Sequence, residues 1–181
     1  MNHIFTDGAC THNGYKDARA SYSVVFWNET TPEGLAFRVP QEEPQTNQRA
    51  ELRGLNHAFE EIQRRDIKTP TTIWTDSEYG RNCIQVWGPQ WKVRGWKRAS
   101  GSKPLEHLDL LKPMIDFYMA NQHFIIIRHI KAHTNKKEFP YTGNALADSL
   151  ATQLLVSTCS TTSNTTFTGH MTFAGSSTPP T

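Results

Sequence analysis

The repeat of apolar residues changes along the chain, and the order of these changes is the feature that most constrains the fold. Three stretches near the N-terminus alternate apolar and polar residues and are separated by turns that contain Gly and Asn. They predict short strands at His3–Cys10, Ala20–Asn28 and Gly34–Pro40. Three consecutive strands joined by short turns favour an antiparallel meander.

Helical spacing begins after the third strand, where apolar residues from Leu52 to Ile62 recur every three or four positions. This spacing predicts a helix from about Thr46 to Arg65. The elements predicted after it are a strand at Thr71–Thr75, helices at Glu78–Trp87 and Leu105–Ala120, a strand at Phe124–Ile130 and a helix at Asn144–Leu155. The β-branched residues of the last strand favour a central position in the sheet. The order βββαβααβα predicts an α/β architecture, a mixed sheet flanked by helices.

The composition changes near Val156, which divides the chain into two parts. From Ser157 to Thr181 there is no charged residue, and more than half of the positions are Ser or Thr. Such a segment cannot bury enough apolar surface to offset the entropy lost on ordering. We therefore expect one domain at residues 1–156, followed by a disordered Ser/Thr-rich tail at residues 157–181.

The chain carries neither a long apolar stretch nor an N-terminal basic region followed by an apolar run. We therefore expect no membrane span and no secretory signal, and an intracellular location in the cytoplasm or nucleus. The three cysteines, Cys10, Cys83 and Cys159, are an odd number without the paired spacing of a metal site. They are interpreted as free thiols, which disfavours zinc.

Four carboxylates stand in distinctive local settings: Asp7, Glu51, Asp76 and Asp148. Asp7 and Asp76 are expected at the C-terminal ends of their strands, where ligand sites in α/β sheets lie. Glu51 and Asp148 share helix faces with apolar residues, so both should point toward the sheet. The four side chains could therefore converge on one place.

Each acid alone also has a structural interpretation. An Asp after a strand is often a turn former, and a Glu in the first turn of a helix is often favoured by the helix dipole. Four inward-facing carboxylates without cations would, however, repel one another, so divalent metal ions are the natural counter-charge. Hard oxygen ligands of this kind suit Mg²⁺ or Mn²⁺, which activate water against phosphodiesters.

Five motifs in order resemble type 1 ribonuclease H, a family that cuts the RNA strand of an RNA/DNA hybrid. The motifs are Thr6-Asp7-Gly8, Thr46-Asn47-Gln48-Arg49-Ala50-Glu51, Thr75-Asp76-Ser77, Ile130-Lys131-Ala132-His133 and Gly143-Asn144 with Asp148. The resemblance covers nearly all of residues 1–156 and implies a five-stranded mixed sheet. It further implies that the four acids bind two Mg²⁺ ions, with Mn²⁺ as a substitute, and that cleavage leaves 5′-phosphate and 3′-hydroxyl ends.

His133 matches the mobile-loop histidine of the family, which is thought to assist proton movement or product release. A lone histidine in a polar loop is otherwise usually only a solvated side chain. The loop from Asn135 to Thr142 is longer here than in familiar members. This longer loop leaves open where His133 lies relative to the acids.

A basic stretch without acids runs from Arg81 to Lys103 and carries interleaved aromatic residues. The candidate nucleic-acid contacts within this stretch and just before it are Tyr79, Trp87, Trp91, Lys92, Arg94, Trp96 and Lys97. Aromatic rings stack on sugars or bases, and cations bind phosphates. Trp87 could also belong to the core, whereas Gly88-Pro89 is expected to end the helix and leave Trp91 and Trp96 outside it. The resemblance makes this stretch the basic protrusion that follows the DNA strand.

The same resemblance assigns further contacts. Thr46 matches a threonine that holds a DNA phosphate, and Asn47 and Gln48 match minor-groove contacts that reach the 2′-hydroxyl of the RNA strand. His107 stands where the family commonly has an asparagine in the phosphate pocket, and a histidine can still donate a hydrogen bond. The remaining candidates are Cys10, Lys103 and Asn144.

These observations predict a monomeric, hybrid-specific endoribonuclease without a separate hybrid-binding domain. Two alternatives stay open. One is another nuclease of the wider superfamily, such as a junction resolvase, that acts on DNA. The other is a module that binds hybrids but has lost catalysis.

Overall fold

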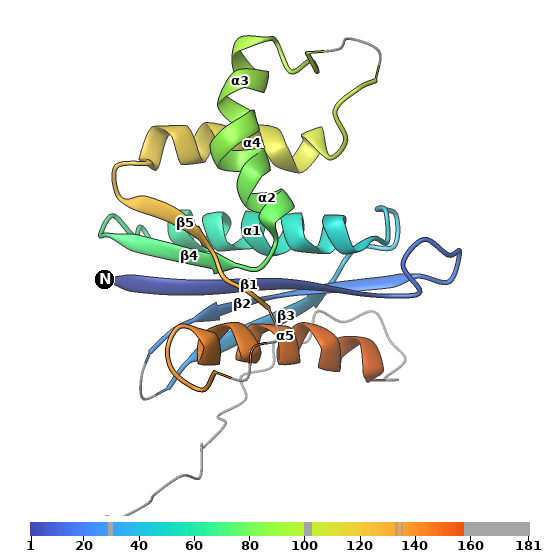
Figure 1. The fold of residues 1–181 in the computed structure, drawn as a ribbon, viewed down its shortest axis with the longest axis vertical. Coiled ribbons are helices and arrows are strands. Elements are labelled where there is room, and N and C mark those ends of the chain that lie inside the picture. The colour runs from blue at the N-terminus through green and yellow to red at the C-terminus, as the bar shows by residue number, and fades with distance from the viewer. Residues whose placement is uncertain (29–30, 100–102, 133, 135, 158–181) are drawn as a thin grey trace, which may run out of the picture.

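The computed structural model describes residues 1–28, 31–99, 103–132, 134 and 136–157. Its strands form one five-stranded sheet in the order β3-β2-β1-β4-β5, and helices cover both faces (Figure 1). The elements are β1 (Asn2–Thr11), β2 (Arg19–Phe26), β3 (Glu33–Arg38), α1 (Asn47–Arg64), β4 (Thr71–Thr75), α2 (Glu78–Asn82), the π-helical turn η1 (Cys83–Trp87), α3 (Gly88–Val93), α4 (Leu108–Asn121), β5 (Ile125–His129) and α5 (Tyr141–Val156).

The sheet is mixed, which confirms the predicted fold class. β1 pairs antiparallel with β2 and parallel with β4, and β4 pairs parallel with β5. The expectation of a central last strand is wrong, because β5 lies at the edge and β1 occupies the centre. Only one face of β5 is buried: Ile125 and Ile127 are in the core, whereas Ile126 between them is 48% exposed. The β-branched run reflects strand propensity rather than burial on both faces.

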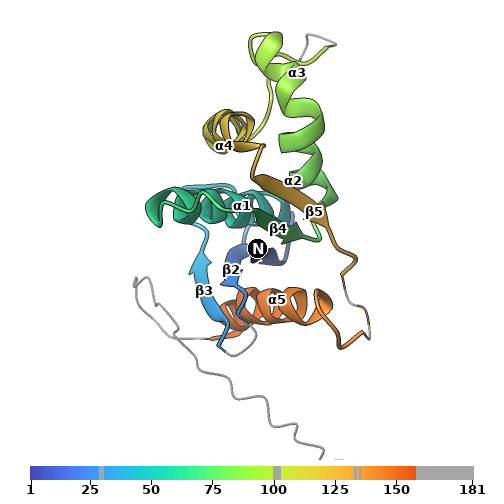
Figure 2. The same cartoon turned by 90° about the vertical axis from the view of Figure 1, so that its left-hand side faces the viewer.

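Helices α1 and α4 lie on one side of the sheet and α5 lies on the other (Figures 1 and 2). The main core lies between the sheet and α1, where Leu52 and Leu55 pack against strand residues such as Ile4 and Ile73. A smaller core joins Phe5 of β1 to Ala147 of α5. Because α1 and α5 both pack on β1, residues from opposite layers can meet along that strand.

The predicted helix at Glu78–Trp87 continues beyond its expected end as α2, η1 and α3, and this stretch rises away from the sheet (Figure 1). Pro89 does not end it, because the residue stands in the first turn of α3, where the missing N–H is not needed. Trp91 and Trp96 are consequently partly buried and pack against the main core, which corrects their placement outside it. The neighbouring helix α4 begins at Leu108 rather than Leu105, and α5 begins at Tyr141 rather than Asn144.

None of the helices that the structure describes is long and apolar enough to cross a membrane. Cys10 and Cys83, the cysteines in the described ranges, are free thiols, as expected. The predicted tail at residues 157–181 lies, apart from Ser157, outside the described residues, so its disorder stays a prediction.

Candidate active site

Asp7 lies in the middle of β1 rather than at the end of a strand, because β1 continues to Thr11. The expectation fails because the antiparallel partner β2 extends the strand, pairing with it as far as Thr11. The parallel pairing with β4 ends earlier, at Thr6 and Thr75. Asp7 is therefore the first residue of β1 past the end of β4, and Asp76 directly follows that end, as predicted.

Glu51 reaches this place because α1 approaches β1 very closely. A Cβ atom at Gly8 would stand only 2.4 Å from the backbone nitrogen of Glu51, so no larger residue fits without displacing the helix. The helix starts as predicted, with Thr46 as its N-cap and the Thr46 side chain accepting a hydrogen bond from the Arg49 N–H at 3.1 Å. Glu51 lies in the second turn and faces the sheet.

Three of the four predicted acids converge. Asp7, Glu51 and Asp76 each offer a carboxylate oxygen, and these atoms all lie within 4.8 Å of one another. Asp7 is 4% exposed and Glu51 is 7% exposed. Asp148 of α5 is outside this group of three, but it is near enough to raise the pKa of the Asp7 carboxyl.

The crowding perturbs the ionisation of the cluster. Burial first, and then the charges of Asp76 and Asp148, raise the pKa of Asp7 to about 8. Burial, followed by the charges of Asp7 and Asp76, also raises the pKa of Glu51 well above its usual range. The nearby Gly8 N–H and Asn47 side chain lower the pKa of Glu51 and only partly offset this effect.

This donor set fits a divalent cation. Glu51 Oε2 is buried and has no hydrogen-bond partner within the described structure, which leaves a lone pair for another ligand. A divalent ion would supply the positive charge that the raised pKa values indicate is missing. Carboxylate oxygens are the ligands that Mg²⁺ and Mn²⁺ prefer.

Of the two residues predicted to lie beside the acids, His133 and Asn144, the structure describes only Asn144. His133 lies outside the described residues, so its role stays a prediction. Asn144 stands one helical turn before Asp148 and is 5% exposed, and its Oδ1 has no hydrogen-bond partner within the described structure. A buried amide oxygen of this kind could accept a hydrogen bond from a water molecule in the site.

The predicted minor-groove contacts lie at the start of α1, beside the acidic cluster. Asn47 and Gln48 are exposed in the first turn, and the backbone N–H of Asn47 donates to Asn13 Oδ1 at 3.1 Å. The β1–β2 turn is thereby joined to the helix start. Cys10 lies on the same side, with its Sγ 3.5 Å from the carbonyl oxygen of Gln45.

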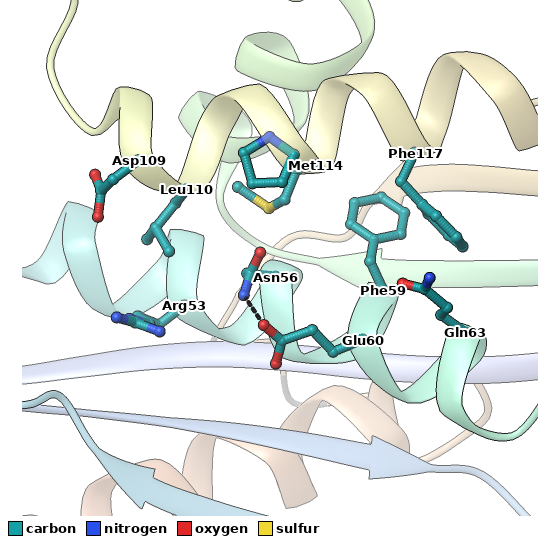
Figure 3. A pocket seen from close by; sticks show the side chains of 10 residues that line it. Arg53, Asn56, Phe59, Glu60, Gln63, Asp109, Leu110, Met114 and Phe117 are labelled. Carbon is teal, nitrogen blue, oxygen red and sulfur yellow. Dashed lines mark hydrogen bonds between the residues drawn. The ribbon is translucent and has the colours of Figure 1, made fainter.

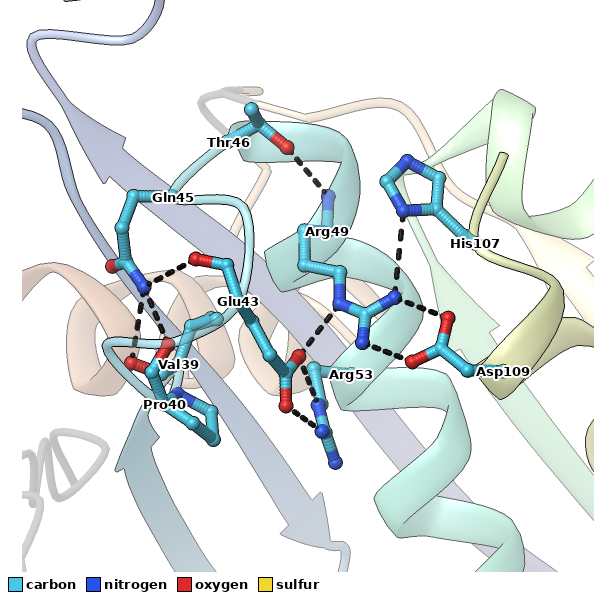
Figure 4. Close-up of polar contacts among 9 residues, drawn as sticks. All are labelled: Val39, Pro40, Glu43, Gln45, Thr46, Arg49, Arg53, His107 and Asp109. Carbon is cyan, nitrogen blue, oxygen red and sulfur yellow. Dashed lines mark hydrogen bonds and ion pairs between the residues drawn. The ribbon is translucent and has the colours of Figure 1, made fainter. Parts of the chain in front are cut away.

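Arg49 connects this helix start to α4 (Figure 4). Its buried guanidinium donates to Glu43 at 2.6 Å and forms a two-pronged ion pair with Asp109. It also approaches His107 Nδ1 at 3.5 Å, and this ring nitrogen must accept because arginine only donates. Burial and the charge of Arg49 lower the pKa of His107. His107 is thus held neutral, with its other ring nitrogen protonated.

Tyr79 and two aromatic residues of the basic stretch form a row along α2, η1 and α3. Ring centroids lie 6.2 Å apart for Tyr79 and Trp87 and 5.8 Å apart for Trp87 and Trp91. Lys92 is ion-paired with Asp116 at 2.6 Å, and Lys112 lies over the ring of Trp96. The exposed cations of the stretch include Arg94, Lys97 and Lys103.

A separate groove of about 440 Å³ lies between α1 and α4 (Figure 3). Its apolar floor includes Phe59 and Met114, and none of the four acids lines it. Two charged groups on its rim already have partners, because Arg53 pairs with Glu43 and Asp109 pairs with Arg49. The groove is therefore distinct from the acidic cluster.

A family model described as RNase H matches residues 2–155. The chain belongs to the RNase H family. Ribonuclease H1 of Rattus norvegicus is 32% identical over 148 residues, which cover 82% of this chain and 48% of that protein. The chain therefore spans about half the length of this relative. A ribonuclease H of Paracidovorax citrulli is also 32% identical over 148 residues, covering 82% of this chain and 89% of the bacterial protein.

The fold of this RNase H family member is also found in solved structures. A foamy viral protease-reverse transcriptase, solved in complex with an RNA/DNA hybrid, superposes with a TM-score of 0.69 at 25% identity. The match covers 84% of this chain and 19% of the viral one. The RNase H domain thus occurs there as one part of a longer polypeptide.

Sequence reasoning missed two residues at the edge of this RNase H site. Arg49 belongs to one of the five motifs, and in the structure it lies between the acids Glu43 and Asp109 and so links three segments. His129 belongs to none of the motifs, yet its Nε2 lies 3.1 Å from the backbone carbonyl oxygen of Asp76. The available signal was that His129 ends the strand after β4, so it falls at the same sheet edge as Asp76.

Proposed function

We propose that this RNase H domain is an endoribonuclease that hydrolyses the RNA strand of RNA/DNA hybrids and leaves 5′-phosphate and 3′-hydroxyl ends. The observation that carries the proposal is the group of three carboxylates within 4.8 Å on an RNase H fold. The relatives named ribonuclease H and the viral neighbour bound to a hybrid support the same substrate.

The metal is proposed to be Mg²⁺, bound as two ions, with Mn²⁺ as a substitute. Asp7, Glu51, Asp76 and Asp148 would hold it, because the oxygens of the first three lie within 4.8 Å of one another and the charge of Asp148 acts on the carboxyl of Asp7. When bound, such ions activate water and stabilise the leaving 3′-oxygen of a phosphodiester. Asp7 is central among the acids, because both Asp76 and Asp148 act on its carboxyl.

The hybrid is proposed to lie across the start of α1 and along the basic stretch. Asn47 and Gln48 would contact the minor groove, where the 2′-hydroxyl of the RNA strand is accessible. Thr46 and His107 would hold a DNA phosphate, and the neutral His107 would donate from Nε2. The row Tyr79–Trp87–Trp91 and the exposed cations would follow the DNA strand.

Further proposals concern the molecule as a whole. We propose that the domain at residues 1–156 acts as a monomer and that residues 157–181 form a separate tail. The free thiols of Cys10 and Cys83 favour a reducing location, the cytoplasm or nucleus. His133 is proposed to assist proton movement or product release beside the acids.

Four end-labelled substrates of one sequence test the function: an RNA/DNA hybrid, double-stranded DNA, double-stranded RNA and single-stranded RNA. We expect cleavage of the RNA strand of the hybrid with Mg²⁺ or Mn²⁺ and none with EDTA. The Asp76→Asn protein serves as the control for contaminating nucleases. Preferred cleavage of DNA would contradict the proposal, as would the absence of metal-dependent cleavage by well-folded protein.

A further inference from the structure

His129 is the last residue of β5, and its imidazole contacts the backbone of Asp76. The distance from Nε2 to the Asp76 carbonyl oxygen is 3.1 Å. A carbonyl oxygen only accepts hydrogen bonds, so Nε2 must carry the proton and donate it. The side chain is exposed, so packing in the core does not account for its position.

The contact begins where the backbone ladder between β4 and β5 ends. The Ile130 N–H donates to the Thr75 carbonyl oxygen at 2.9 Å, which is the next backbone bond after the paired residues Thr75 and His129. The Asp76 carbonyl oxygen follows along the chain. The imidazole of His129 therefore extends the attachment of β4 to β5 by one residue, as far as the acid itself.

Asp76 needs such an attachment because it has left the strand and stands among like charges. Its carboxylate lies within 4.8 Å of those of Asp7 and Glu51. When these groups are ionised and no cation is bound, repulsion among them favours a rotation or displacement of Asp76 away from the other two. A hydrogen bond on its own carbonyl oxygen restrains that displacement, because it fixes the peptide unit that follows the Cα atom of Asp76.

We propose that His129 is a positioning residue, which holds Asp76 in the arrangement that accepts a divalent cation. The inference rests on the proposed function insofar as the acidic cluster binds the metal. His129 touches neither the reacting phosphate nor the metal in this role. Its contribution is to keep the ligand set assembled while the site is empty of cation, so that less free energy is needed to bind one.

The test is a Mn²⁺ titration of the full chain by isothermal calorimetry, without nucleic acid. We expect His129→Ala to weaken Mn²⁺ binding about fivefold, the ratio expected from one ordinary hydrogen bond. His129→Gln, which retains an N–H donor, should restore the affinity to within about twofold of the original protein. Arg128→Ala is the matched control, because Arg128 precedes His129 on β5 but lies over the ring of Trp74. The Mn²⁺ affinity of this variant should equal that of the original protein.

A second measurement separates positioning from stability. Urea unfolding in EDTA should give similar midpoints for His129→Ala and Arg128→Ala, since both side chains are exposed. Unchanged Mn²⁺ affinity in His129→Ala, failure of His129→Gln to restore it, or no saturable Mn²⁺ binding by the original protein would each overturn the inference. If Mn²⁺ binds as expected but no hybrid is cleaved, the proposed function fails while the role of His129 stands.

Discussion

Gly143 of α5 lies against the ring of Phe5 on β1, so closely that a Cβ atom at residue 143 would stand 2.3 Å from Cε2 of the ring. Phe5 is fully buried, and its neighbours are the aromatic rings of Trp27, Trp74 and Phe139. The ring therefore has no room to move aside. This contact sets the height of α5 above β1 and so brings Asp148, further along the helix, beside Asp7.

Gly143→Ala should lower the free energy of unfolding by about 1–3 kcal/mol, the usual cost of adding a methyl group to a filled core. Urea unfolding measures the change. Gly54→Ala is the matched control, because Gly54 is also a buried helical glycine but its Cβ would meet its nearest neighbours at 3.4 Å. That variant should be nearly neutral, since alanine favours the helix. Equal effects of the two substitutions would show that the contact with Phe5 is unimportant.

Asp76→Asn should leave folding intact and remove at least about 99% of the hybrid cleavage, because loss of one ligand costs several kcal/mol of transition-state stabilisation. Initial rates on labelled hybrid measure the loss, and circular dichroism checks the fold. Asp66→Asn is a suitable control, since Asp66 is exposed and forms an ion pair with Lys68 on the surface. Retained activity in Asp76→Asn would remove this residue from the metal ligands.

Asp7→Asn should stabilise the metal-free protein while it abolishes cleavage. The pKa of Asp7 is raised to about 8 in the folded chain, above its ordinary value of 3.8, so the folded state binds the proton more tightly than the unfolded state. By linkage, the stability contributed by this proton is complete below about pH 4 and is lost as the pH rises toward 8.

Thermal unfolding in EDTA between pH 5 and pH 8 tests the direction of this change in stability. The original protein should lose stability as the pH rises over that range, and Asp7→Asn should lose less and be more stable at pH 8 by at least about 1 kcal/mol. Added Mn²⁺ should stabilise the original protein more than the variant. A metal-free Asp7→Asn protein that is less stable than the original at pH 8 would refute the electrostatic explanation.

The lowered pKa of Glu61 should make the stability of the protein depend on pH in the opposite direction. Hydrogen bonds from Arg64, and next from Arg65, lower its pKa to about 2 against the penalty of burial. The stability that results is present above about pH 4.5 and is lost as the pH falls toward 2. Glu61→Gln should therefore cost about 1–2 kcal/mol at pH 7, less than the full shift implies because Arg64 is exposed.

Urea unfolding at pH 7 and pH 3 measures this contribution, and the difference between Glu61→Gln and the original protein should shrink at the lower pH. Glu60→Gln is the control, because Glu60 accepts a hydrogen bond from Asn56 that a glutamine can also accept. A difference that persists unchanged at pH 3 would exclude ionisation of Glu61 as its cause.

The site acids were predictable because strand and helix periods place side chains on definite faces. Glu51 and Asp76 follow directly from those periods, and three of the four predicted acids meet as one group. The position of Asp7 within its strand was not predictable, since the length of β1 depends on pairing with β2 and not on residues near Asp7. The same holds for β5, because an apolar run does not reveal how many neighbours a strand has.

Contacts between distant segments account for the other differences. Pro89 normally indicates a helix end, but the π-helical turn before it lets a new helical turn start at Gly88. His129 and Arg49 act through partners 53 and 60 positions away, Asp76 and Asp109, which no local pattern reveals. Whether His133 and the proposed nucleic-acid contacts act as the resemblance implies stays a prediction.

The π-helical turn at Cys83–Trp87 makes the direction of the aromatic row depend on chain length. Such a turn holds about one residue more than an α-helical turn, and one residue corresponds to roughly 100° of rotation about a helix axis. Deleting a single residue there would turn Trp91 to a different side from Tyr79 without changing either residue. The side of the helical stretch on which these rings lie is thus encoded in a residue count, which a comparison of aromatic positions alone would overlook.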